Sequence, residues 1–204
     1  NSLLSPEPDY FLTVNSDAIL ETDCLKILVE TLDRHQECAI ASPMIYKDET
    51  KQKVDNVGYN LSYRFLIPTD LSKYTGNHHN YIRKGIRYVN WTDDVVALMR
   101  KNAIMDVGGY DEDYFMYVEM TDMAYRLIKK GYRFIVNYNA IAYHRGKGSS
   151  GNYISDFSVY YKLRNWLRFQ RKFYPTYQLP YTISWILAMY GIYTMLMILR
   201  LRYK

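Results

Sequence analysis

The sequence has few cysteines and contains no internal repeat or low-complexity segment. Cys24 and Cys38 are its two cysteines among 204 residues, and neither belongs to a motif with metal-ligand spacing. Cysteine use of this kind favours a reducing compartment, and we expect both side chains to fill the core. The first residues carry neither a basic stretch nor a long apolar run, so no signal peptide is expected.

The bulk composition is that of a folded protein with a substantial core. Hydrophobic residues make up 49% and charged residues 23%, which argues against disorder. A chain of 204 residues is the size of one large domain or two small ones. Its 23 tyrosines suit carbohydrate stacking or a membrane interface, and they equally suit an ordinary core.

Charge is distributed unevenly along the chain. Residues 145–204 hold ten lysines and arginines against one acidic residue, whereas residues 1–144 hold sixteen against twenty. We therefore expect an acidic front, 1–150, and a basic, apolar back, 151–204, that face different partners. No nucleic-acid partner is expected for the back part, because its aromatic and basic residues adjoin an uncharged segment and fit anionic lipid headgroups better.

The segment 178–199 contains no charged residue and is followed by three basic ones. It is long enough to span a bilayer with the basic flank on the cytoplasmic side. Its tyrosines and threonines favour an in-plane membrane helix equally. The predicted location is the cytoplasmic face of a membrane.

Apolar runs and helical periodicity alternate along the front part. Strand patterns at 10–14 and 39–46 enclose a helical pattern, which predicts a strand–helix–strand unit. Such a unit implies an α/β fold with a mostly parallel sheet flanked by helices. Residues 47–86 are polar and weakly periodic, and we expect a long excursion there.

Six carboxylates lie close together in the segment 106–122, with aromatic residues between them. They are Asp106, Asp111, Glu112, Asp113, Glu119 and Asp122. Acidic side chains interleaved with bulky apolar ones suggest the rim of a pocket. A turn followed by a helix with an acidic first turn is the alternative.

Two further candidates end predicted strands. Asp17 follows the strand at 10–14, and His144 ends the last predicted strand. Mg²⁺ and Mn²⁺ take oxygen ligands, Mn²⁺ tolerates an imidazole, and substrate phosphates complete their coordination. Arg145 and Lys147 follow the histidine and could neutralise a diphosphate.

The order of these motifs resembles the inverting family 2 glycosyltransferases of the GT-A fold, especially the rhamnosyltransferase-like branch that builds bacterial surface polysaccharides. The matching segments are Asn15-Ser-Asp17, Gly108-Gly-Tyr-Asp-Glu112, Glu119-Met-Thr-Asp122 with Arg126, His144, and Arg164-Asn165. Each motif alone is common, and their shared order carries the resemblance.

The resemblance implies a Rossmann-like GT-A domain that transfers a sugar from a nucleotide-diphosphate sugar to a glycan or lipid-linked acceptor, with inversion and with Mn²⁺ or Mg²⁺. The implied metal ligands are Asp17 and His144. The implied donor-binding residues are Asn15, Arg145 and Lys147, and the implied acceptor-binding residues are Trp91, Asp94 and Asp111.

The chain departs from the family pattern at the general base, where Met120 replaces the usual Asp. A thioether accepts no proton at neutral pH, so the expected catalytic residues are Glu119 and Asp122, with Asp93 or Asp94 as alternatives. Without a base, the chain would be a catalytically silent glycan-binding or assembly module at the membrane.

A second departure concerns the front of the domain. The resemblance places the first strands and the nucleotide pocket before the strand at 10–14. We therefore expect the GT-A domain to be incomplete at its N-terminus, and a missing N-terminal portion or a second copy of the chain to be a partner.

Overall fold

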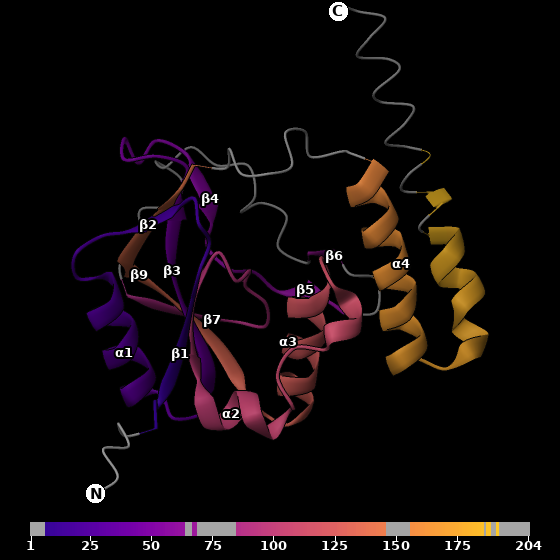
Figure 1. Cartoon of the computed structure of the whole chain (residues 1–204), viewed down its shortest axis with the longest axis horizontal. Coiled ribbons are helices and arrows are strands. Elements are labelled where there is room, and N and C mark those ends of the chain that lie inside the picture. The colour runs from indigo at the N-terminus through magenta and orange to yellow at the C-terminus, as the bar shows by residue number, and fades with distance from the viewer. Residues whose placement is uncertain are drawn as a thin grey trace, which may run out of the picture.

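The computed structural model describes residues 7–63, 67–68, 85–145, 156–185, 187–188 and 191. A twisted mixed sheet forms its centre, with helices on both faces (Figure 1). The strands of the sheet are β1 (Tyr10–Val14), β2 (Ala18–Leu20), β3 (Cys38–Tyr46), β4 (Val54–Asn56), β7 (Ile86–Val89), β8 (Val96–Arg100) and β9 (Arg133–His144). The pair β5 (Leu61–Ser62) and β6 (Ile67–Pro68) lies apart from it.

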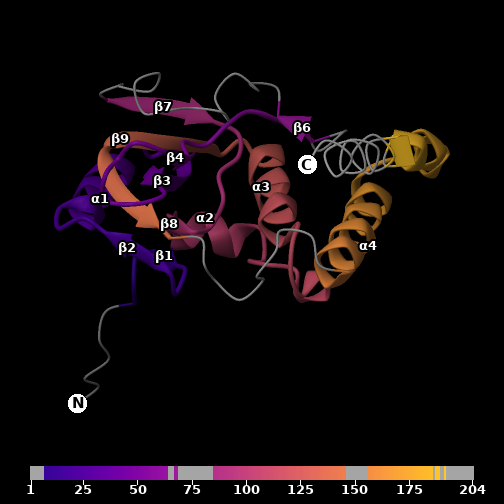
Figure 2. The same cartoon turned by 90° about the horizontal axis from the view of Figure 1, so that it is seen from above.

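The helices follow the sequence pattern. They are α1 (Cys24–Arg34), α2 (Lys101–Asp106), α3 (Glu119–Lys129) and α4 (Asp156–Phe173), with 3-10 turns η3 (Glu112–Tyr114) and η4 (Thr176–Gln178). Figure 2 shows α1 on one side of the sheet and α3 on the other, with α4 outside α3. The α/β class is therefore confirmed.

The prediction of a mostly parallel sheet is wrong. The strand order is β1-β8-β3-β9-β2, and among the described pairs only β3 with β9 is parallel. The unit β1-α1-β3 does run in one direction, as its helical crossover requires. However, β8 lies between these two strands and is antiparallel to both, which mixes the sheet.

Strand β9 is one long strand with an irregularity in its middle. Its register against β3 shifts between the pairs Pro43↔Asn137 and Met44↔Ile141, so residues 138–140 are extra. Strand β7 pairs with β9 before this irregularity, and β2 pairs with it afterwards. The interruption thus lets one strand serve two antiparallel neighbours.

Alternate side chains of the central strands enter different cores. On β3, Ile40 joins the core under α3, whereas Ala41 joins the core under α1. This alternation follows from the period of two in a strand. Cys24 and Cys38 are free, buried and part of the core under α1, as predicted, and burial raises the pKa of each thiol to about 12.

The acidic segment 106–122 and the basic helix α4 form ion pairs with each other instead of facing different partners. Asp122 on α3 is fully buried, and its carboxylate contacts Arg126 at 2.6 Å, Lys172 of α4 at 2.8 Å and the Tyr114 hydroxyl at 3.0 Å. Arg168 of α4 pairs with Asp113. Local charge balance therefore attaches α4 to the rest of the domain.

The described part of the chain after α4 begins with η4 and continues as a helix from residue 179, which lies beside α4 (Figure 1). Thr182 in this helix lies 3.4 Å from Gln170 of α4. Among the described residues, no helix has both the length and the apolar character to cross a membrane. Much of the predicted segment 178–199, including 192–199, lies outside them.

Replacement of Asp122 by alanine should destabilise the fold strongly. The change leaves Arg126 and Lys172 without their shared buried carboxylate, and loss of one partner from a buried ion pair costs about 3–5 kcal/mol. The matched control is Asp106→Ala, which breaks an exposed 3.1 Å pair with Lys130 and should cost less than about 1 kcal/mol. Urea unfolding of both variants measures the difference, and equal losses would contradict the structural role.

Candidate active site

Three side chains from separate segments, two on strands and one in the turn before β2, meet at one end of the sheet. His144, the last residue of β9, has its Nδ1 2.7 Å from Asp55 Oδ2 and its Nε2 3.4 Å from Asp17 Oδ1. Each of the three side chains is about one-fifth exposed: 24% for Asp17, 20% for Asp55 and 18% for His144. The family resemblance implied that Asp17 and His144 lie together, and the structure adds Asp55.

Strand register explains this meeting. Ala18 of β2 pairs with His144, so the preceding Asp17 lies beside the histidine, and Arg145 donates its backbone N–H to the Asp17 carbonyl at 3.2 Å. On the other side, Tyr46 of β3 pairs with both β9 and β4. Strand β4 therefore brings Asp55 to the same end of the sheet.

The Asp17–His144 pair has the chemistry of a partial divalent-cation site. A carboxylate oxygen and an imidazole nitrogen face each other, and this donor set suits Mn²⁺. Among the described residues, no cluster of three or more His, Cys, Asp or Glu side chains has the arrangement of a complete metal site. The residues present thus fit a cation that takes its remaining ligands from substrate phosphates, as Mg²⁺ and Mn²⁺ often do.

Two of the three predicted donor-binding residues, Asn15 and Arg145, lie close to this pair in the chain. Asn15 is exposed, and its backbone forms the turn that joins β1 to β2. Arg145 is exposed and contacts Glu49 at 2.8 Å. Lys147 lies outside the described residues.

A second acidic group lies where residues before β8 meet the start of α3. Tyr110 donates its hydroxyl to Asp94 at 3.2 Å, and Asn56 of β4 donates its side-chain amide to Asp93. Burial, with a contribution from the Asp94 charge, raises the pKa of Glu119 and raises that of Asp93 to about 7. These carboxyl groups therefore lie close enough to influence one another.

Two of these carboxyl groups have a buried oxygen without a hydrogen-bond partner in the described structure. They are Oδ1 of Asp93 and Oε2 of Glu119. A buried polar atom without a partner is costly and commonly marks a position where a ligand, a water or a reacting group completes the site. Each of these oxygens is therefore able to accept a hydrogen bond from a bound molecule.

The other predicted catalytic and acceptor residues have different surroundings. Asp122 is enclosed by its ion pairs, and Asp111 contacts Lys172 at 2.7 Å, which lowers the Asp111 pKa through hydrogen bonding. Trp91 is half-buried, packs against Tyr59 in a tilted arrangement with 4.5 Å between ring centroids, and donates its indole N–H to Thr121 at 3.1 Å. Trp91 therefore lies near the start of α3, whereas Asp111 and Asp122 support α4.

The turn before Glu119 has an unusual backbone. Phe115, Tyr117 and Val118 have φ values of 60°, 65° and 71°, and such left-handed non-glycine residues cost about 1–3 kcal/mol each. The buried Asn165 amide of α4 donates to the carbonyls of Tyr114, Met116 and Tyr117 at 2.6–2.8 Å. Helix α4 thus holds the strained turn that positions Glu119.

Sequence reasoning missed Asp55, Asn56 and the role of Tyr110. The first two belong to the segment 47–86, where β4 is only three residues long and shows no periodic pattern. Tyr110 belongs to the acidic segment, but its hydroxyl faces Asp94 through a contact between distant elements. The available signal for Asp55 and Asn56 was the position of β4, a short strand that follows the predicted strand at 39–46 and pairs with it as a hairpin.

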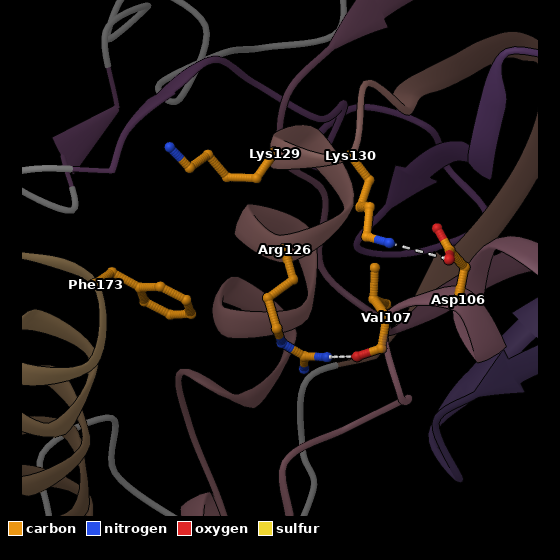
Figure 3. Close-up of a pocket in the computed structure, with 6 residues that line it drawn as sticks. All are labelled: Asp106, Val107, Arg126, Lys129, Lys130 and Phe173. Carbon is orange, nitrogen blue, oxygen red and sulfur yellow. Dashed lines mark hydrogen bonds and ion pairs between the residues drawn. The ribbon is translucent and has the colours of Figure 1, made fainter.

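Two cavities lie outside both groups. One, of about 370 Å³, is lined by Asp106, Val107, Arg126, Lys129, Lys130 and Phe173 (Figure 3). The Arg126 guanidinium at this cavity donates to the carbonyls of Val107 and Gly109 and pairs with Asp122. The other, of about 410 Å³, lies between β2, α1 and β9 and includes Glu21 and Tyr143.

The sequence is similar to those of curated rhamnosyltransferases. Rhamnosyltransferase WbbL of Escherichia coli is 28% identical over 145 residues, which cover 67% of this chain and 53% of that protein. An N-acetylglucosaminyl-diphospho-decaprenol L-rhamnosyltransferase of Mycobacterium tuberculosis is 38% identical over 65 residues, which cover 32% of this chain and 21% of that protein. No protein-family model matches the chain.

A crystal structure of GalNAc-T7 with UDP, GalNAc and Mn²⁺ has the same fold, with a TM-score of 0.57 at 10% identity over 83% of this chain and 32% of that one. The chain is a glycosyltransferase relative with a GT-A fold. The resemblance drawn from the motifs is thereby confirmed. The chain spans about half the length of WbbL.

The raised pKa of Asp93 predicts a pH dependence of stability. Because the native state disfavours the charged carboxylate, its contribution to stability is complete below the ordinary pKa and is lost as pH rises through about 7. Asp93→Asn removes this loss, so its unfolding free energy should fall less between about pH 5 and about pH 8 than that of the wild type. Urea unfolding at both pH values measures this, with exposed Glu112→Gln as control, and parallel changes in all three proteins would contradict it.

Proposed function

We propose that the chain is part of a glycosyltransferase that moves a sugar from a nucleotide-diphosphate sugar to a glycan or lipid-linked acceptor, with inversion and with Mn²⁺ or Mg²⁺. The observation that carries the proposal is the approach of His144 Nε2 to Asp17 Oδ1 at 3.4 Å, at strand ends of a GT-A fold. The sequence relationship to rhamnosyltransferases supports it.

In this proposal the donor lies at the end of the sheet that carries His144. Asp17 and His144 hold the divalent cation, and Asn15, Arg145 and Lys147 bind the donor around it. A bound cation would stabilise the negative charge on the departing nucleoside diphosphate. Arg145 adds a guanidinium, which is suited to phosphate oxygens and can exchange its exposed contact with Glu49 for them.

Glu119 is the proposed general base. It removes the proton from the acceptor hydroxyl while that oxygen attacks the donor sugar from the side opposite the leaving diphosphate, which inverts the configuration. Its partly buried carboxyl group with a partner-free oxygen supports this role. Asp122, the other predicted catalytic residue, is fully enclosed by Arg126, Lys172 and Tyr114, so we assign it to support of the site.

The acceptor is proposed to lie near the start of α3. The half-buried Trp91 offers a ring for stacking against a sugar, and Asp94 offers a carboxylate to its hydroxyls. Asp111 is proposed to affect acceptor binding indirectly, because its carboxylate is paired with Lys172 of α4. We also propose that the tail meets the cytoplasmic face of a membrane, on the basis of the uncharged segment 178–199 and its basic flank.

The alternative is a silent glycan-binding or assembly module. Met120 favours it, since this residue occupies the position of the family's usual base and its buried side chain belongs to the core under α3. In this case the acidic group binds sugar hydroxyls without proton transfer. A partner, either a second copy or a missing N-terminal portion, would then supply catalysis.

Replacement of Glu119 by glutamine separates the two functions. If Glu119 is the base, sugar transfer from UDP-, GDP- or dTDP-sugars should fall by about 10²–10⁴-fold, while Mn²⁺ binding persists. The matched control is Glu112→Gln, which removes an exposed carboxylate of the same segment and should leave transfer unchanged.

Three results distinguish the candidates in this assay. Transfer by Glu119→Gln at the wild-type rate would contradict the role of Glu119. Glycan binding by the wild type without any transfer would favour the silent module. Loss of transfer together with loss of Mn²⁺ binding would show that Glu119 supports the metal site instead.

A further inference from the structure

Asp55 is the residue that fixes His144, and the sequence motifs give it no role. Its carboxylate oxygen Oδ2 lies 2.7 Å from Nδ1 of the histidine, whereas Nε2 on the opposite side of the ring faces Asp17. We propose that Asp55 is a positioning residue that selects the histidine tautomer able to bind a divalent cation through Nε2. This inference rests on the proposed function.

We assign the direction of the hydrogen bond from the chemistry of the pair. An ionised carboxylate only accepts hydrogen bonds, so in this 2.7 Å contact we assign the proton to Nδ1, which donates it. In a neutral imidazole the other nitrogen then has a free lone pair. That lone pair points toward Asp17, where the cation would bind.

The surroundings of Asp55 hold the carboxylate in this orientation. Its second oxygen, Oδ1, lies 3.5 Å from Lys47 Nζ, so each oxygen has its own partner. The backbone N–H of Lys47 donates to the Lys53 carbonyl at 2.9 Å, which closes the hairpin between β3 and β4. The side chain that steadies Asp55 is thus part of the hairpin that delivers it.

Strand β4 also contacts the second acidic group, through Asn56, the residue after Asp55. Asn56 donates to Asp93, and its own oxygen accepts the backbone N–H of Gly58 at 2.5 Å. The charge of Asp55 contributes to the raised pKa of Asp93, which places the two carboxyl groups near each other. Adjacent residues of one short strand therefore contact the metal side and the base side of the site.

Carboxylates that receive the second N–H of a ligating histidine orient the ring and raise its basicity, and their loss usually weakens metal binding by about 10–100-fold. We expect Asp55→Ala to weaken Mn²⁺ binding by this factor, measured by electron paramagnetic resonance on the full chain. Asp55→Asn should have a smaller effect, because its amide oxygen can still accept from Nδ1. Glu30→Gln, which removes an exposed carboxylate of α1, is the charge control and should bind Mn²⁺ like the wild type.

A second measurement needs no metal and reports the ring itself. Long-range ¹H–¹⁵N spectra of histidine-labelled protein distinguish the two neutral tautomers, and His144→Gln identifies the signal. The wild type should hold the Nδ1–H form, whereas Asp55→Ala should show a mixture. A merely structural role of Asp55 would alter stability without shifting this tautomer population.

The outcomes separate this inference from the proposed function. Equal Mn²⁺ affinity of the wild type and Asp55→Ala, with the same tautomer in both, overturns the role of Asp55 alone. No Mn²⁺ binding by the wild type, with or without nucleotide, overturns both. Weaker binding and a mixed tautomer in a folded Asp55→Ala, together with unchanged binding by Glu30→Gln, support the inference.

Discussion

The parallel pairing of β3 with β9 is the constraint on which the site depends. Its register, with Tyr46 opposite Tyr143, brings the end of β9 to the point where β4 turns back along β3. The irregularity at residues 138–140 leaves the second half of β9 free to pair with β2. Asp17, Asp55 and His144 therefore meet because the pairings of β2 with β9, β3 with β9 and β3 with β4 all lead to the same end of the sheet.

A buried charge network holds the other half of the site. Asp122 binds Arg126 and Lys172, and Arg126 in turn donates to the carbonyls that precede the acidic turn. Asn165 fixes the strained turn from the same helix as Lys172. These contacts explain why a helix outside the sheet matters for the position of Glu119, and they assign Asp122 a supporting part.

The sequence predicts the parts of this structure that depend on local pattern. Apolar runs located the strands at 10–14 and 39–46, and strand endings located Asp17 and His144. Sheet direction was predicted wrongly, because the position of β8 between β1 and β3 depends on pairing between distant residues. Asp55 escaped prediction for the same reason, since its contact with His144 spans 89 positions. Burial likewise decides which acidic residues are enclosed in ion pairs and which keep a carboxylate oxygen without a partner. The sequence pattern alone does not reveal burial.

Mn²⁺ binding by electron paramagnetic resonance, with and without UDP, GDP and dTDP, tests the central claim most directly. The account predicts that one of these nucleotides strengthens Mn²⁺ binding and that Asp17→Ala and His144→Ala each abolish the effect, because both side chains hold the cation against the diphosphate. Mn²⁺ binding that is absent from the wild type, or equal in the wild type and both variants, would contradict the account.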